Sequence, residues 1–581
     1  MHNKKIISLL LAGTLITSLG VVIYFLFFSP QEPPEVMIKN AFRSRWDTTK
    51  MSMGSSNSTQ VKLPLTPYGT YNFTVDWGDG KNNTITSWNQ TEATHDYASA
   101  GVYEITINKT IVGWCFNNTG DKLKLLTILE WSVLRLGDTG GYFHGCLNFE
   151  VTTRDILNLT GTTNMDLAFA DCRSLSSARN MNEWDTSKIT SMVKTFYNAD
   201  EFTQDIADWN VSSVLNMSGM FYEARNFNRK INNWDVSNVR DMSHMFSATS
   251  FNQDIGSWNV SRVSNMSYMF AGTPFNRDIG DWDVSSVTSM RFMFAEATTF
   301  NQNIGDWDVA NVTDMTAMFL STYEFNKDIG QWDVSRVSCM MSMFNSARLF
   351  DQDISNWNVS RVTDMRYMFV GAEKFNQSIG DWNVSSVTKM YAMFYEAYNF
   401  NQDISKWDVS GVRDMGVMFR GAHTFNQSLS DWNVSSVVEM QGMFQGATAF
   451  NQDISSWDVS EVVGMSNMFD GASSFNQNIS NWDVSEARDM RYMFRNAISF
   501  DQDIGSWNVW QVMEMEDMFL GATLSTPNYD SLLIDWSNLS LREDVLFHGG
   551  DSQYSAGEAA IARANIISTY NWTIIDGGQV P

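Results

Sequence analysis

A tryptophan recurs at an almost fixed interval through the middle of the chain. Fourteen tryptophans follow one another at spacings of 25 residues, with two spacings of 24: Trp184, Trp209, Trp234, Trp258, Trp282, Trp307, Trp332, Trp357, Trp382, Trp407, Trp432, Trp457, Trp482 and Trp507. A self-similar period between 20 and 50 residues is typical of repeat architectures, in which each unit stacks on the next. The sequence therefore predicts one long stack of short units rather than several separate globules.

Other apolar residues keep fixed distances from each tryptophan. Methionine stands eight residues after every one, from Met192 to Met515, and phenylalanine stands twelve residues after every one, from Phe196 to Phe519. A second methionine column lies eleven residues after each tryptophan except the first, where Thr195 stands. These two columns hold 27 of the 35 methionines. Because methionine packs well against aromatic rings, the columns predict a continuous core rather than a row of metal or haem ligands.

One unit, residues 400 to 422, illustrates the expected local structure. Ile404, Trp407 and Val409 are spaced like the strand residues of a leucine-rich repeat. The next apolar residues, Met415, Met418, Phe419 and Ala422, follow the i, i+3, i+4, i+7 spacing of a short helix. The predicted fold class is an α/β repeat solenoid, leucine-rich-repeat-like, with one short parallel strand and one short helix per unit.

The repeat resembles the BspA-like leucine-rich-repeat surface proteins. The motif Phe-Asn-Gln-Asp-Ile that carries the resemblance begins intact at Phe251, Phe400 and Phe450. The similarity covers residues 184 to 522, the predicted solenoid of about fourteen units. It implies a cell-surface protein concerned with adhesion and binding, and it implies no catalytic residues.

The N-terminus carries an apolar segment long enough to cross a membrane. Lys4 and Lys5 precede an uncharged run from residue 6 to residue 28, and a helix of that length spans a bilayer core of about 30 Å. We expect residues 1–28 to be a cytoplasmic stub and signal-anchor helix, with cleavage near Ser29 as the alternative. The lysines favour an internal N-terminus. The prediction is a single-pass membrane protein with a stalk at 29–58 and the bulk of the chain outside.

A small β domain is predicted at residues 59–112. Residues 71 to 75 alternate like a half-buried strand, and Asp76-Trp77-Gly78-Asp79-Gly80 supplies the turn that ends it. Together with His95-Asp96-Tyr97 and the strand pattern from Gly101 to Ile107, this segment resembles the PKD domain, which implies a small all-β immunoglobulin-like domain. Turn and strand-end roles account for His95 and the aspartates, so no metal or acid-base site is predicted there.

Two atypical regions flank the repeats, as stacked units require at their ends. Residues 113–183 are expected to be degenerate units that form the N-terminal cap, with Cys146 and Cys172 one unit apart in an alanine column. These cysteines are either small core residues or a disulfide. Residues 523–581 are expected to form the C-terminal cap, in which Ser555 and Glu558 open a helix that runs to Tyr570.

The candidate binding site is the polar column directly after the tryptophans. It contains only aspartate and asparagine: Asp185, Asn210, Asp235, Asn259, Asp283, Asp308, Asp333, Asn358, Asn383, Asp408, Asn433, Asp458, Asp483 and Asn508. Side chains alternate across a strand, so this column is expected to face outward between two buried residues. Either it binds Ca²⁺, sugar hydroxyls or a protein partner, or it only keeps the surface soluble. No unit has enough ligands for Ca²⁺ alone, so no cofactor is assigned and a Ca²⁺ site would be shared.

Asn-x-Ser/Thr sequons are a second surface feature. Outside the repeat copies they include Asn57, Asn72, Asn89, Asn158 and Asn571. In a eukaryotic secretory pathway these are candidates for glycosylation, whereas in a bacterium they carry little meaning. If the copies inside the repeat, such as Asn358 and Asn383, carried glycans, the polar column would be blocked.

The remaining chemistry argues for binding without catalysis. The six histidines are scattered and no phosphate-binding or dinucleotide motif is present, so we expect no enzyme. The net charge of −26 argues against a nucleic-acid partner, which requires a basic face. The sequence thus predicts a surface protein that binds extracellular proteins or glycans, and the alternative is a structural coat component that self-associates.

Overall fold

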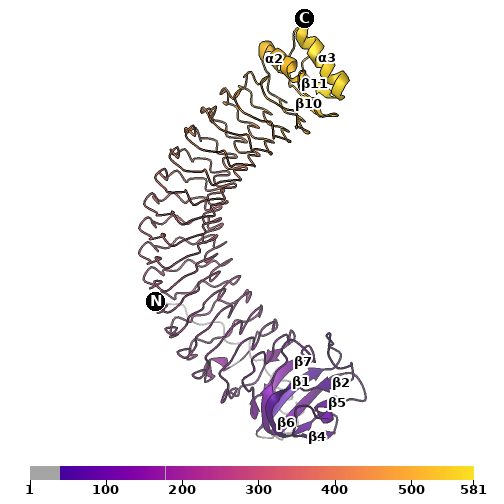
Figure 1. Ribbon diagram of the computed structural model, residues 1–581. Helices are drawn as coiled ribbons and strands as arrows, with labels where there is room; N and C mark the ends of the chain where they lie inside the picture. Colours follow the sequence, from indigo (N-terminus) through magenta and orange to yellow (C-terminus); the bar gives the residue numbers. More distant parts are fainter. Residues whose placement is uncertain (1–39, 177, 179) are drawn as a thin grey trace, which may run out of the picture.

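The computed structural model describes residues 40–176, 178 and 180–581. An N-terminal β-sheet, a long series of stacked repeat units and a small helical C-terminal region follow one another along the chain (Figure 1). The units lie side by side along a curved arc, with the sheet at one end and the helices at the other (Figure 1). The shape is therefore that of an extended stack.

The N-terminal part is built on a mixed seven-stranded sheet of order β4-β3-β6-β1-β7-β9, with β8 paired to β6. Its strands are β1 (Ala41–Asp47), β3 (Leu65–Asp76), β4 (Asn82–Ile85), β6 (Val102–Trp114), β7 (Leu125–Glu130), β8 (Leu134–Arg135) and β9 (Glu150–Val151). β2 (Gln60–Lys62) pairs with β5 (Thr94–Asp96), and the 3-10 helix η1 (Thr91–Ala93) precedes β5. Strand β1 comes from the stretch predicted as a stalk, and it lies inside the sheet between β6 and β7.

A buried lysine fastens the loop before β2 to this sheet. The Lys124 ammonium donates hydrogen bonds to the backbone carbonyls of Ser56, Asn57 and Gln60 at 2.8 to 2.9 Å. It also lies 3.4 Å from a carboxylate oxygen of Asp121. Burial lowers the pKa of Lys124. The hydrogen-bond acceptors offset the free energy that is lost when the ammonium group is removed from water. These hydrogen bonds hold residues 56 to 60 on the sheet, although that segment has few apolar side chains to pack against it.

The repeat units contain turns where the sequence predicted helices. In the described part of the chain the α-helices are α2 (Thr526–Trp536) and α3 (Glu558–Tyr570), and both follow the last repeat. Neighbouring units are joined by isolated parallel bridges, such as the one between Asp414 and Glu439. The predicted α/β solenoid with one strand and one helix per unit is therefore wrong.

The hydrogen bonds of one unit explain why no helix forms. The N–H groups of Met415, Val417 and Phe419 donate to carbonyls of the next unit at 2.8 to 3.0 Å. Met418 and Ala422 instead donate to carbonyls three residues earlier in their own unit. An α-helix requires every N–H to bond within its own segment, and here alternate donors leave it. We call this segment, from seven to fourteen residues after each tryptophan, the turn ribbon.

Left-handed backbone positions fix the path of the turn ribbon. In the unit of Trp407, Val417 has φ 49° and Gly421 has φ 70°; one unit further along the column, Gly442 and Gly446 have φ 60° and 69°. A left-handed residue every fourth position reverses the helical path. The apolar spacing i, i+3, i+4, i+7 consequently places the same residues inward from a chain of turns as it does from a helix.

The core is a set of aromatic columns that run the length of the stack. The Phe419 ring lies 5.6 Å from that of Phe394, one repeat earlier, and 4.1 Å from that of Phe425, six residues later, measured between centroids. Trp382 and Trp407 stack at 6.5 Å with an interplanar angle of 1°. The phenylalanine columns are fully buried and the repeat tryptophans are at most 4% exposed. The columns of the sequence are thus columns of a single core.

The two edges of the stack have different spacings. Backbone hydrogen bonds join the turn ribbons, which brings neighbouring chains to about 4.8 Å as in a sheet. On the tryptophan edge the units are joined through side chains, for example by the Trp407 indole N–H, which donates to the carbonyl of Ile379 at 3.0 Å. The wider indole spacing there bends the stack toward the turn ribbon, and this accounts for its arc (Figure 1).

Both ends of the core are covered. At the N-terminal end Phe143, Phe169 and Phe196 continue the phenylalanine column at 5.5 Å spacing, and η2 (Met181–Glu183) precedes Trp184. Cys146 and Cys172 are buried here as free thiols. At the other end α2 and α3 pack with β10 (Leu546–His548) and β11 (Thr573–Ile575), which form a parallel pair.

The prediction of single-pass membrane anchoring is not supported by the structure. Among the residues that the structure describes, no helix is both long and apolar enough to cross a bilayer. The apolar segment at residues 6 to 28, on which the prediction depended, lies outside the described residues.

We predict that Phe419→Ala lowers the free energy of unfolding by about 3–5 kcal/mol, because it opens a cavity between rings that cannot collapse. Urea unfolding followed by circular dichroism measures the change. Lys406→Ala is the control: its side chain is 72% exposed, so we expect a change within about 0.5 kcal/mol. Equal effects of the two substitutions would contradict the role of the aromatic columns.

Candidate functional site

The predicted polar column lies at the surface, but its side chains close turns. Asp408 is exposed between the buried Trp407 and Val409. Its Oδ1 accepts hydrogen bonds from the Ser410 N–H at 3.1 Å and the Ser410 hydroxyl at 2.6 Å. Such Asx turns are a common use of aspartate and asparagine in loops. We call this column the Asx ladder.

Thirteen of the fourteen predicted residues, from Asp185 to Asp483, make the same backbone bond to the residue two positions later. Ser410 and its counterparts lower the pKa of six aspartates through hydrogen bonds to the carboxylate: Asp185, Asp235, Asp283, Asp333, Asp408 and Asp458. One oxygen of each side chain is committed to its own turn. The geometry accounts for this column by local structure.

The structure does not gather these carboxylates into a metal cage. Within the described ranges no three histidine, cysteine, aspartate or glutamate side chains are grouped so that they would hold an ion. Ca²⁺ requires about six to eight oxygen ligands. Spaced along the stack one per unit, the aspartates of the Asx ladder do not converge on one point.

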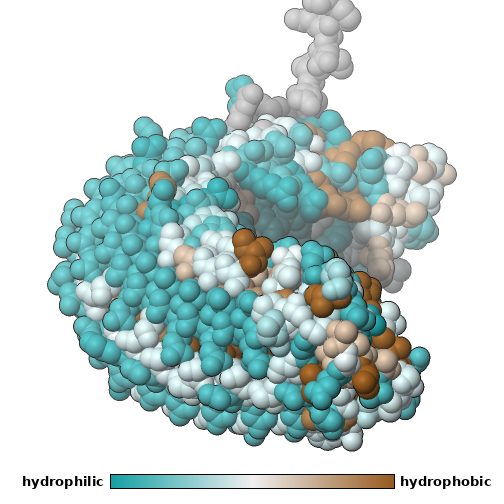
Figure 2. All heavy atoms as spheres, turned by 90° about the horizontal axis from the view of Figure 1, so that it is seen from above, coloured by the Kyte–Doolittle hydropathy of each residue, from teal (hydrophilic) through white to brown (hydrophobic). Residues whose placement is uncertain are grey.

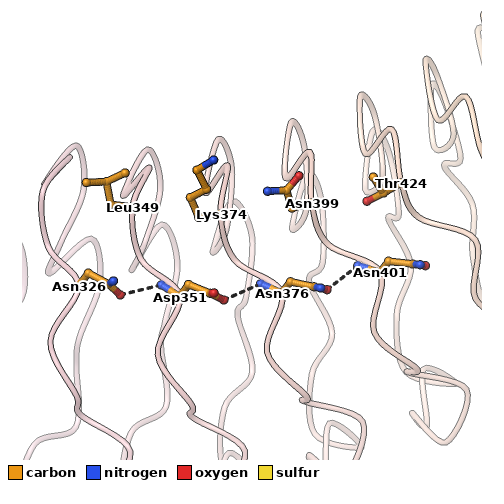
Figure 3. A pocket seen from close by; sticks show the side chains of 8 residues that line it. All are labelled: Asn326, Leu349, Asp351, Lys374, Asn376, Asn399, Asn401 and Thr424. Atoms are coloured by element: carbon orange, nitrogen blue, oxygen red, sulfur yellow. Dashed lines mark hydrogen bonds between the residues drawn. The ribbon is translucent and has the colours of Figure 1, made fainter.

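A different polar row, which sequence reasoning missed, crosses the units. The Asn376 side-chain oxygen accepts a hydrogen bond from the Asn401 N–H at 2.9 Å (Figure 3). It also accepts one from the Gln402 side-chain amide at 3.0 Å. The same backbone link connects each unit to the next from Asn228 to Asp501: through Asn252, Asn276, Asn301, Asn326, Asp351, Asn376, Asn401, Asn426, Asn451 and Asn476. The signal was the Asn-Gln pair of the Phe-Asn-Gln motif. We call this row the amide ladder.

Helix α2 ends the amide ladder. The Asp501 side-chain oxygen accepts hydrogen bonds from the Ser525 N–H at 2.7 Å and from the Asn528 amide at 2.8 Å. These donors take the place of the asparagine N–H and glutamine amide of a further unit. The ladder is thus satisfied at its C-terminal end without another repeat.

A shallow groove of about 690 Å³ runs beside the amide ladder. Its floor is the ladder itself, and Leu349, Lys374, Asn399 and Thr424 project from the loops above it (Figure 3). The oxygens of the ladder are already occupied by N–H donors, so the groove offers few acceptors. It has the form of an open surface between loops rather than of an enclosed small-molecule pocket.

The turn ribbon presents the most variable surface of the repeat. Its inward columns are constant, whereas the position ten residues after the tryptophan is occupied by Lys194, Gly219, His244, Tyr268, Phe292, Ala317, Ser342, Tyr367, Ala392, Val417, Gly442, Asn467, Tyr492 and Asp517. All these units share one backbone path, so the fold does not dictate which residue stands there. The small residues Ala317 and Ala392 are buried there, whereas larger ones such as Tyr268 are partly exposed. The variation therefore changes how much side chain the ribbon shows to solvent.

Tyrosine, serine, glycine, asparagine and arginine are frequent at the outward ribbon positions. Arg420 lies over the Tyr395 ring at 5.3 Å and Arg495 over the Tyr492 ring at 4.5 Å. This composition is typical of antibody paratopes, where tyrosine gives large rigid contacts and the small polar residues adapt. The face of the molecule seen in Figure 2 is mostly hydrophilic, with hydrophobic residues only in small groups.

The predicted sequons are mainly accessible. Asn57, Asn72, Asn89 and Asn571 are exposed and Asn158 is partly buried. Within the repeat, the Asn358 side-chain oxygen accepts the Ser360 hydroxyl at 2.7 Å, as part of the Asx ladder. Their glycosylation stays a prediction.

The family described as "Mycoplasma protein of unknown function, DUF285" matches the chain at residues 163–274, 271–371, 349–453 and 425–532. These overlapping matches cover residues 163 to 532 without a gap, which is more than half of the chain. No curated protein matches the sequence. The resemblance to BspA-like leucine-rich repeats and to the PKD domain stays a prediction.

We predict that acid destabilises the Asx ladder. Each carboxylate whose pKa is lowered on folding stabilises the protein above its ordinary pKa, and that contribution is lost as the pH falls through the lowered value. The thermal midpoint should therefore drop as the pH falls below about 4, the ordinary pKa of an aspartate. Asparagine at Asp235, Asp283, Asp333 and Asp408 keeps the turns, as Asn383 does, and should flatten the drop.

Replacing Asp281 and Asp306, exposed aspartates outside these turns, is the control for this titration. If both sets of substitutions changed the acid sensitivity equally, the turns would not be its source.

We predict that Asn376→Ala lowers the free energy of unfolding by about 1 kcal/mol. The Asn401 N–H and the Gln402 side-chain amide would both lose their uncharged acceptor near the surface. Asn376→Asp should have little effect, since Asp351 holds the same position in the ladder. Urea midpoints of the two variants measure the difference, and equal loss from both would argue against the amide ladder as a stabilising element.

Proposed function

The chain belongs to the family described as Mycoplasma protein of unknown function, DUF285, and we propose that it is a surface protein whose turn ribbon recognises protein or glycan partners. The observation that supports this most is the contrast within each unit. Columns that face the core and the two ladders stay nearly constant, while the outward ribbon positions vary from unit to unit.

Rigidity of the ribbon supports a recognition role. Successive ribbons are joined by several backbone hydrogen bonds per unit, and the buried ring columns beneath them leave little freedom. A binding surface that is already ordered loses less entropy when a partner binds. Large partners fit such an extended surface better than small molecules do.

We propose binding rather than catalysis. His95 lies between the rings of Trp77 and Tyr97, and its Nε2 is 3.0 Å from the Asp79 carboxylate. Burial raises the pKa of Asp79, but the hydrogen bonds and charges of His95 and Lys81 together outweigh that effect and lower the pKa. These contacts serve the packing of the sheet region, and a net charge of −26 supports a partner other than a nucleic acid.

The alternative, a structural component that self-associates, rests on the C-terminal end. Ile561 in α3 is 62% exposed, Met513 before the cap is 53% exposed and Ile575 in β11 is 46% exposed. Exposed apolar residues near the end of a stack favour contacts between copies. Light scattering of the purified protein distinguishes the two, since a strict monomer disfavours assembly.

We predict that arginines placed along the ribbon abolish recognition. Ser218, Ser243 and Ser466 occupy a column in which Arg291, Arg366 and Arg491 are already present, so their replacement by arginine should leave the fold intact. The new side chains should obstruct a partner and lower its affinity at least about tenfold. Arrays of surface proteins and of glycans, probed with the full-length protein, provide the measurement.

The matched control is Ser286→Arg, Ser386→Arg and Ser436→Arg. These exposed serines follow the Asx ladder, in a column where Arg262, Arg336 and Arg361 stand in other units. Partners lost with the ribbon variant and kept with the control support the proposal. Absence of any partner on both arrays, at low and high salt and with added Ca²⁺, would refute it.

A further inference from the structure

Five rings from consecutive units form one continuous row on the turn ribbon. Tyr197 and Tyr222 lie 5.3 Å apart between centroids, Tyr222 and His244 5.4 Å, His244 and Tyr268 4.4 Å, and Tyr268 and Phe292 4.6 Å. The rings of the last two pairs are nearly parallel, with interplanar angles of 9° and 4°. All five side chains are partly exposed. We call these residues the aromatic row.

Three residues of the aromatic row hold a backbone conformation that disfavours large side chains. His244, Tyr268 and Phe292 have φ of 57°, 60° and 55°. A bulky residue in the left-handed region is strained, and such strain persists where the rest of the structure imposes it or function requires it. The path of the turn ribbon imposes the left-handed backbone conformation at this position, but it does not require an aromatic side chain.

The same column shows that the fold needs no ring here. Gly219 and Gly442 adopt φ of 60° at this position, and Ala317 adopts 52°. Glycine takes this conformation without the steric cost of a Cβ. Bulky residues also stand at this position in single units, as Val417, Tyr367 and Tyr492 do with φ of 49°, 59° and 58°, so the row is set apart by having rings in three adjacent units. The rings are thus a choice of side chain that the backbone path does not require.

We infer that the aromatic row is the anchor site for a basic protein partner, an inference that rests on the proposed function and locates it. Tyrosine and other aromatic residues provide most of the energy in many protein interfaces. They are usually surrounded by a polar rim. Here the rim carries the acids Glu223, Asp241 and Glu296 and the bases Lys194 and Arg291, each within the ribbon of a unit that contributes a ring, so that acids outnumber bases by three to two.

The arrangement of the rings favours protein over carbohydrate. Because His244, Tyr268 and Phe292 stack, they cover one another's faces. The rings of Tyr197 and Tyr222 are tilted by 33° to each other and lie within 5.4 Å of their neighbours. At the two ends Lys194 lies over Tyr197 at 5.5 Å and Arg291 over Phe292 at 5.3 Å, so the end faces are covered as well. Few faces are left on which a sugar ring stacks, whereas edges and hydroxyl groups suit a mixed apolar and polar protein surface.

The net charge of the chain indicates the charge expected of the partner. The chain has a net charge of −26, and a strongly acidic protein attracts basic surfaces over long range. Burial is the main effect that lowers the pKa of His244, so its ring is neutral near pH 7 and adds no repulsion. Lysine and arginine around an apolar centre are therefore the expected features of the partner.

The test uses a phage-displayed library of random peptides selected on the full-length protein. We expect the enriched peptides to combine lysine or arginine with aromatic or aliphatic residues. Their affinity should fall at least about tenfold for the triple variant His244→Gly, Tyr268→Gly and Phe292→Gly. Because glycine relieves the backbone strain, the thermal midpoint of this variant should stay the same or rise.

The matched control is Tyr367→Gly with Tyr492→Gly. These tyrosines have φ of 59° and 58° in the same column but stand outside the aromatic row. The control should bind the selected peptides within about twofold of the unchanged protein. If the triple variant were destabilised, alanine at the same three positions, as at Ala317 and Ala392, repeats the measurement with smaller backbone effects.

The outcomes separate the inference from the proposed function. Peptides that tolerate the triple variant but are lost with the ribbon arginines at Ser218, Ser243 and Ser466 would overturn the aromatic row and leave ribbon recognition standing. Acidic peptides, or glycans that depend on the row, would overturn the basic protein partner. Lack of any peptide, protein or glycan ligand would refute the proposed function itself.

Discussion

The backbone hydrogen bonds from each turn ribbon to the next are the interaction on which this structure depends. They set the spacing between units, and the aromatic columns can stack only because that spacing is regular. With Met415, Val417 and Phe419 donating to the following unit, the chain cannot close a helix of its own. A unit alone would leave these donors and its rings in water, so stability resides in the contacts between units.

The same bonds divide the surface into fixed and free positions. Inward residues such as Trp407 and Phe419 are fully constrained by neighbours on both sides. The Asx ladder and the amide ladder are constrained as well, since their oxygens complete turns and unit-to-unit links. What stays free is the outward side of the ribbon, and there the side chains differ most from one unit to the next. Side chains that recognise a partner are most easily placed at positions where the fold does not restrict the residue type.

The acidic character of the chain has a different meaning in different places. Aspartates of the Asx ladder, including Asp408, each serve their own turn, so their number does not amount to a metal site. Asp351 and Asp501 substitute for asparagine in the amide ladder because only an acceptor oxygen is needed there. Beside the aromatic row, Asp241 closes a turn by accepting the Ser243 N–H at 2.8 Å and also adds charge to the rim. One residue type therefore serves turn closure, unit linkage and the charge of the surface.

The sequence by itself determined the repeat, its length, the burial of the Trp407, Met415 and Phe419 columns and the outward position of the Asx ladder, because these follow from spacing alone. Only the tertiary structure decided between helix and turn, since the same apolar spacing suits both and the choice depends on donors that bond to another unit. It also showed that Asp408 closes a turn, that Asn376 links units, and that Tyr222, His244 and Tyr268 meet. Most of these contacts join residues of neighbouring repeats, about 25 positions apart in the sequence. A local sequence pattern does not show how close such residues lie in space.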